Sequence, residues 1–121
     1  MNKKIVYVLE DDPDISEMIH YVLSDAGYEV ETCGTVDRFQ EKLEFKIPDI
    51  FILDILLPDG NGLDICRQLR ANESTAPTPI LVMSAHQTKR EIDAIGCASD
   101  FIPKPFNIDY FRQRVDHFCL N

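Results

Sequence analysis

The feature that most constrains this sequence is a regular alternation of short apolar runs with segments of helical periodicity. Apolar or mixed runs predict strands at 4–9, 28–32, 50–53, 80–83 and 101–102. Apolar residues then recur at helical spacing, which predicts helices at about 13–26, 36–45, 63–70, 89–95 and 108–118. This order predicts an α/β fold, with a doubly wound parallel sheet covered by helices on both faces.

Capping residues mark the ends of two of these helices. Asp12 and Pro13 fit an N-cap followed by the first helical residue of the segment 13–26. Thr88 and Glu91 have the spacing of a capping box, and Gly96 can end the same helix. The fourth helix is therefore expected to be short, spanning residues 89–95.

Length and composition narrow the class of protein. The 121 residues, with 45% hydrophobic, suit one domain over 1–121 with no effector domain in this sequence. The first apolar run is too short for a secretory signal, so we expect a cytoplasmic location. Four widely spaced cysteines form no CxxC pair and are expected to be buried and reduced. The net charge of −9 argues against direct nucleic-acid binding.

Polar residues that can carry chemistry follow the predicted strands. The first strand is followed by three acids, the third by Asp54, the fourth by Ser84 and the fifth by Lys104. The carboxyl ends of parallel strands lie at one edge of a sheet, where open α/β folds bind their ligands. These side chains are therefore expected to meet in one site.

Crowded carboxylates attract a hard cation, and oxygen ligands of this kind suit Mg²⁺. A carboxylate such as Asp54 can also act as a nucleophile and form an aspartyl phosphate. Lys104 and the Ser84 hydroxyl could then stabilise the phosphoryl group.

Each residue also has a simpler explanation. Asp12 can be only a helix cap, Asp54 and Ser84 can be turn residues, and Lys104 can be a solvated side chain. Their combination and order, rather than any one of them, indicate a functional site.

Four segments together resemble the receiver domain of two-component response regulators, and the resemblance covers essentially the whole chain. They are Val8–Asp12, Asp49–Gly62, Ile80–Ala85 and Asp100–Phe106. The resemblance implies a flavodoxin-like receiver fold with a five-stranded sheet in the order 2-1-3-4-5 and five helices. It also implies a cis peptide bond between Lys104 and Pro105.

The resemblance implies a role for each residue of the acidic site. Asp54 would be the phosphoryl acceptor and a Mg²⁺ ligand. Asp11 would bind Mg²⁺ directly and Glu10 through a water, and the Leu56 carbonyl would be a further ligand.

The remaining roles concern the phosphorylated state. Ser84 would hydrogen-bond the phosphoryl group, Lys104 would pair with it, and Ser84 and Phe101 would together form the switch. Leu56 and His86 hold positions that modulate dephosphorylation in the family.

The implied function is two-component signal transduction. A histidine kinase or a histidine phosphotransfer protein would donate the phosphoryl group. Helix 4, strand 5 and helix 5 would then change the face presented to a downstream protein, an effector domain or a second copy of the chain. The domain would be a switch with self-catalysed phosphoryl transfer and autodephosphorylation, not an enzyme that turns over a metabolite.

Two departures from the family pattern lie outside the acidic site. The interval from Ser84 to Lys104 is about two residues shorter than usual, and Cys97 stands where a glycine is common. Both concern the surface expected to signal rather than the site itself.

Three other functions fit parts of the pattern. A phosphohydrolase with an aspartate nucleophile usually carries a second acid two residues later, where this chain has Leu56. A flavodoxin-like cofactor module would need a phosphate-binding loop where acids follow the first strand. A degenerate receiver that only binds partners would not need all the site residues.

Overall fold

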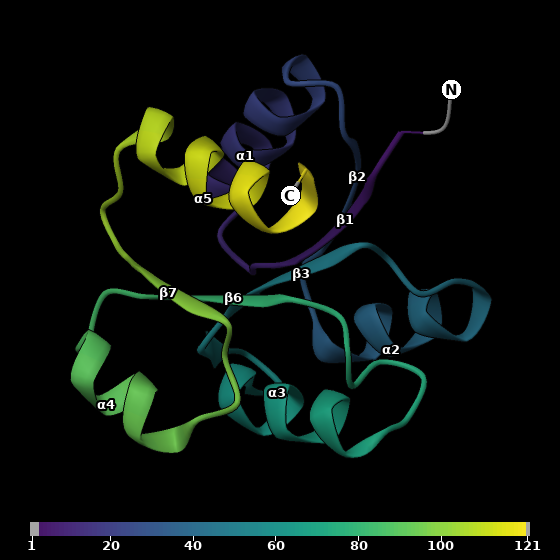
Figure 1. The fold of residues 1–121 in the computed structure, drawn as a ribbon, viewed down its shortest axis with the longest axis vertical. Coiled ribbons are helices and arrows are strands. Elements are labelled where there is room, and N and C mark those ends of the chain that lie inside the picture. Colours follow the sequence, from purple (N-terminus) through teal and green to yellow (C-terminus); the bar gives the residue numbers. More distant parts are fainter. Residues whose placement is uncertain (1–2, 121) are drawn as a thin grey trace.

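The computed structural model describes residues 3–120 and shows a parallel five-stranded sheet in the order β2-β1-β3-β6-β7 (Figure 1). The strands are β1 (Ile5–Leu9), β2 (Glu29–Cys33), β3 (Ile50–Asp54), β6 (Ile80–Ser84) and β7 (Asp100–Pro103). Counting only the strands of this sheet, the order is the predicted 2-1-3-4-5, so the predicted topology is confirmed.

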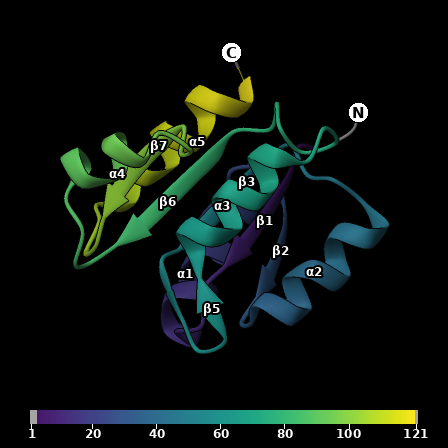
Figure 2. The same ribbon diagram turned by 90° about the horizontal axis from the view of Figure 1, so that it is seen from below.

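Five helices cover the two faces of the sheet. They are α1 (Pro13–Asp25), α2 (Val36–Phe45), α3 (Gly62–Ala71), α4 (Lys89–Ile95) and α5 (Ile108–Leu120). Helices α1 and α5 lie on one face, and α2, α3 and α4 lie on the other (Figures 1 and 2).

The central strands are apolar nearly throughout because both of their faces are covered. Alternate residues of β1 point to opposite sides: Tyr7 joins the core under α2 and α3, whereas Val6 and Val8 join the core under α1 and α5. Phe39 and Phe111 are the large aromatic anchors of the two cores, and both are fully buried. The edge strand β2 is partly exposed along most of its length.

Local signals fix the helix ends as the sequence indicates. The Asp12 carboxylate accepts the Asp14 and Ile15 amides at 2.9 and 3.3 Å, which caps α1. Thr88 and Glu91 form the predicted capping box at the start of α4. The predicted bounds of α2 and α4 are confirmed, whereas the other elements shift or extend by one or two residues.

A short hairpin not foreseen in the sequence follows β3. Strands β4 (Leu56–Leu57) and β5 (Gly60–Asn61) form an antiparallel pair between β3 and α3. The Asp59 carboxylate at its tip accepts the Val36 amide at 2.9 Å. The hairpin therefore ties the loop after β3 to the beginning of α2.

All four cysteines are free and buried, as predicted. Burial raises the pKa of the Cys119 thiol to about 11, which disfavours the reactive thiolate. Among residues 3–120, no helix is both long and apolar enough to cross a membrane.

Candidate functional site

Strand register brings the acidic residues together at one end of the sheet. Leu9 of β1 pairs with Leu53 of β3, so the residues that follow them, Glu10 and Asp54, lie at the same level. Asp54 in turn pairs with Met83, which places Ser84 one step beyond it on β6. These side chains line a shallow cleft of about 230 Å³ at the carboxyl edge of the sheet.

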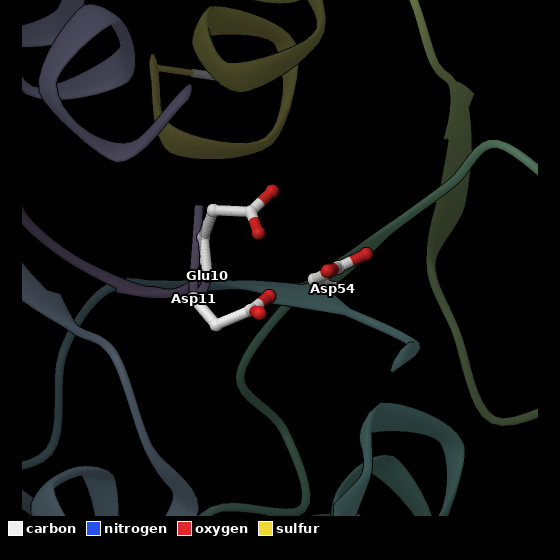
Figure 3. Close-up of side chains that lie close together, drawn as sticks. All are labelled: Glu10, Asp11 and Asp54. Carbon is white, nitrogen blue, oxygen red and sulfur yellow. The ribbon is translucent and has the colours of Figure 1, made fainter. Parts of the chain in front are cut away.

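Three carboxylates converge in this cleft. One oxygen from each of Glu10, Asp11 and Asp54 lies within 4.8 Å of the others (Figure 3). Glu10 and Asp54 are buried, whereas Asp11 is exposed at the mouth. Such a set of hard oxygen donors, open to solvent on one side, fits Mg²⁺, which retains several of its waters.

Lys104 supplies the positive charge of the cleft. Its ammonium donates to Glu10 Oε1 at 2.5 Å and lies 3.2 Å from Asp54 Oδ1. The lysine follows β7 directly, and its own amide donates to the Ser84 carbonyl at 2.9 Å. The Lys104–Pro105 peptide bond is cis, as predicted.

Burial and charge shift the pKa values of this ion pair. Burial raises the pKa of the Glu10 carboxyl from 4.5 to about 7, although hydrogen bonds from Lys104 and the Asp12 amide oppose the shift. Burial opposes the charged form of Lys104 as well. The hydrogen bond and charge of Glu10, together with Asp54, outweigh this cost and raise the lysine pKa. The cleft thus keeps Lys104 cationic while Glu10 holds a proton more readily than an exposed carboxyl does.

A glycine contact positions the backbone of Asp54. A Cβ on Gly62 would lie only 2.0 Å from the Asp54 carbonyl oxygen, and the Gly62 amide donates to the Ile55 carbonyl at 2.8 Å. Only glycine permits the start of α3 to approach β3 this closely. The sequence pattern predicts the helix that follows but does not reveal this contact.

The Ser84 hydroxyl is buried and fully hydrogen-bonded. It donates to Gln87 Oε1 and accepts the amides of His86 and Gln87 at 3.0 and 3.2 Å. Gln87 is half-buried. The sequence pattern gives no sign of its role, because the contact with Ser84 depends on the conformation of the β6–α4 loop.

The other predicted residues lie in two different parts of the structure. Leu56 and His86 line the cleft with the acids and are exposed, with the Leu56 side chain at its mouth. Phe101 is not among the cleft residues. It lies in the core on the α2, α3 and α4 side of the sheet, with 4% of its surface exposed.

Known proteins share this fold and sequence pattern. A family model described as the response regulator receiver domain matches residues 6–116. This chain belongs to that family. It is 32% identical over 112 residues to the phosphate regulon transcriptional regulatory protein PhoB of Rhizobium meliloti, covering 91% of this chain and 49% of PhoB. The chain therefore spans about half the length of the curated relatives it matches.

Solved receiver structures superpose along almost the whole chain. A putative response regulator from Chloroflexus aurantiacus is 28% identical, with a TM-score of 0.90, and the match covers 99% of this chain and 100% of that one. The response regulator TrrA from Thermotoga maritima, solved with Mg²⁺ and beryllofluoride, is 26% identical with a TM-score of 0.84. That match covers 95% of this chain and 98% of TrrA. The receiver fold and family are therefore established for this chain.

Proposed function

We propose that this receiver domain accepts a phosphoryl group on Asp54 and acts as a Mg²⁺-dependent signalling switch. The observation that carries the proposal is the convergence of Glu10, Asp11 and Asp54 with Lys104 in one cleft. A solvated surface cluster would not need two buried carboxylates and a half-buried lysine beside them.

The reaction is a transfer from a phosphohistidine donor. An Asp54 carboxylate oxygen forms a bond to phosphorus while the bond from phosphorus to the donor nitrogen breaks, and the electron pair stays on that nitrogen. Lys104, 3.2 Å from Asp54 Oδ1, is placed to pair with the new phosphoryl oxygens.

The metal would be held by Asp11, Asp54 and the Leu56 carbonyl, with Glu10 bound through a water. When bound, Mg²⁺ would neutralise charge on the transferring group. The structure of TrrA, which is 26% identical to this chain, was solved with Mg²⁺ and beryllofluoride. This supports Mg²⁺ as the metal of the cleft here.

Output would run through Ser84 and Phe101 to the face formed by α4, β7 and α5. Phe101 is already buried against the core under α4, so we propose a shift within a packed layer rather than the burial of an exposed ring. Leu56 and His86, at the cleft, would tune access of water and hence the lifetime of the phosphoryl group.

The partners would be a histidine kinase or phosphotransfer protein as donor, and a downstream protein, an effector domain or a second receiver as target. The relatives are transcriptional regulators by name, and this chain spans only about half of their length. The net charge of −9 supports a domain that regulates through protein contacts and does not itself bind nucleic acid. We propose no enzymatic turnover beyond self-catalysed phosphoryl transfer and autodephosphorylation.

Acetyl phosphate with Mg²⁺, followed by intact mass measurement, tests the proposal. We expect the mass to rise by one phosphoryl group in the wild type and in Asp25→Asn, which alters an exposed carboxylate at the end of α1. Asp54→Asn should abolish the gain. Phosphorylation of a native residue in Asp54→Asn would overturn the assignment.

A Mg²⁺ titration tests the metal ligands separately. Asp11→Ala should weaken Mg²⁺ binding, because Asp11 is one of the three convergent carboxylates. Unchanged affinity in Asp11→Ala would place the metal elsewhere.

A further inference from the structure

The hydrogen-bonding capacity of the Ser84 hydroxyl is completely used. A hydroxyl has one proton to donate and two lone pairs to accept with. The amides of His86 and Gln87 fill the two acceptor positions, at 3.0 and 3.2 Å. The single proton goes to the side-chain oxygen of Gln87.

The orientation of the Gln87 amide follows from this count. If its NH₂ group faced Ser84 instead, three donors would compete for two lone pairs and the hydroxyl proton would have no acceptor. Ser84 is only 3% exposed, so solvent offers little replacement for a lost partner.

The proposed switch needs the same proton. A phosphoryl group on Asp54 offers only acceptor oxygens, so Ser84 can bind it only by donating its hydroxyl hydrogen. Gln87 and the phosphoryl group therefore compete for one hydrogen atom.

We propose that Gln87 is a positioning residue that holds Ser84 in the unphosphorylated arrangement and so sets the threshold of the switch. The inference rests on the proposed function of Asp54 and adds a residue of the β6–α4 loop to it. Gln87 lies immediately before Thr88, the N-cap of α4, so the contact joins Ser84 to the residue that precedes this helix.

Binding of beryllofluoride with Mg²⁺, a probe for the phosphoryl group, tests this inference. Gln87→Met keeps the length of the side chain but removes the acceptor. We expect it to bind beryllofluoride about three- to tenfold more tightly, the range expected for loss of one competing hydrogen bond. Gln68→Met, on the exposed face of α3, should bind as the wild type does. Gln87→Glu should bind more weakly, because its carboxylate is a stronger acceptor for the Ser84 proton and repels the anion.

A double-mutant cycle separates positioning from general loosening of the loop. In a Ser84→Ala background there is no proton to compete for, so Gln87→Met should change the affinity less than twofold. The same fold-change with and without Ser84 would overturn the inference, as would a Gln87→Met affinity within twofold of the wild type. Failure of the wild type itself to bind beryllofluoride would instead count against the proposed function. Thermal melts of each variant, measured in parallel, identify any that do not fold, and Gln87→Ala then replaces Gln87→Met.

Discussion

The Lys104 ammonium lies 2.5 Å from Glu10 Oε1, and this ion pair is nearly enclosed, with 15% of the lysine side chain and none of the glutamate side chain exposed. The same ammonium lies 3.2 Å from Asp54 Oδ1. A cation of the protein thus neutralises part of the acidic cluster. Any metal ion that binds there meets a site whose negative charge is already partly balanced.

Removing this internal cation should strengthen metal binding. We expect Lys104→Met to bind Mg²⁺ more tightly by about tenfold, or about 1.4 kcal/mol, because a unit charge a few ångströms from the ligands no longer repels the ion. Calorimetric titration well above pH 7, where the Glu10 carboxyl is ionised, measures the change. Lys4→Met is the matched control and should leave the affinity unchanged. Lys4 is exposed and directly precedes β1, at the end of the strand away from the cleft. Weaker Mg²⁺ binding in Lys104→Met would contradict the geometry.

Metal binding should weaken in acid because Glu10 holds a proton up to about pH 7. A raised carboxyl pKa means that the ionised form, which attracts the metal, is fully present only above that value. Asp54, Asp11 and Lys104 also face this carboxyl, so the charges of all three groups affect the pH at which Glu10 loses its proton. We expect the Mg²⁺ affinity to be constant above about pH 8 and to fall by up to about tenfold per unit below pH 7.

The variant Glu10→Gln isolates this titration. It should bind Mg²⁺ more weakly at about pH 8, since one negative charge is lost, and its affinity should depend less on pH. An equally steep dependence in the variant would assign the titration to another group.

The start of α3 should tolerate no side chain beside Asp54. A Cβ on Gly62 would overlap the Asp54 carbonyl oxygen at 2.0 Å, and backbone on both sides leaves little freedom to move. We expect Gly62→Ala to lower the free energy of unfolding by about 1–3 kcal/mol or more, measured in urea. Gly34→Ala is the control, because nothing lies within 4 Å of its Cβ position. Its effect should stay within about 0.5 kcal/mol.

The sequence predicts those features that depend on local signals. Thr88, Glu91 and Gly96 define both ends of α4, because each acts on the backbone within one turn. Strand order follows from the alternation of elements and the resemblance. The contacts of Gly62 with Asp54 and of Gln87 with Ser84 were not foreseen, because they depend on loop conformations that periodicity does not encode. The β4–β5 hairpin was missed for a related reason: two-residue strands are too short to show a pattern.

Helix α4 should be the least protected helix among residues 3–120 in hydrogen exchange. It has seven residues, and Ile92 is its one buried side chain, with Ile95 partly buried. A helix of two turns gains little by itself and depends on such contacts. We expect the amides of Arg90 to Ile95 to exchange faster than those of the thirteen-residue α1. Equal protection in the two helices would contradict this expectation.

A capping substitution tests why α4 is marginal. Thr88→Ala removes the side chain that accepts the Glu91 amide at 3.2 Å, and should speed exchange throughout α4 by about five- to tenfold, the effect of losing about 1 kcal/mol. Thr35→Ala removes the equivalent cap of α2 and should act on α2 alone.

The faster exchange caused by Thr88→Ala should stop near Gly96. The Arg70 side chain donates to the Cys97 carbonyl at 2.8 Å and to Ser99 Oγ at 3.0 Å, which fastens the following segment to α3. If Thr88→Ala speeds exchange equally on both sides of Gly96, α4 does not open as a separate unit.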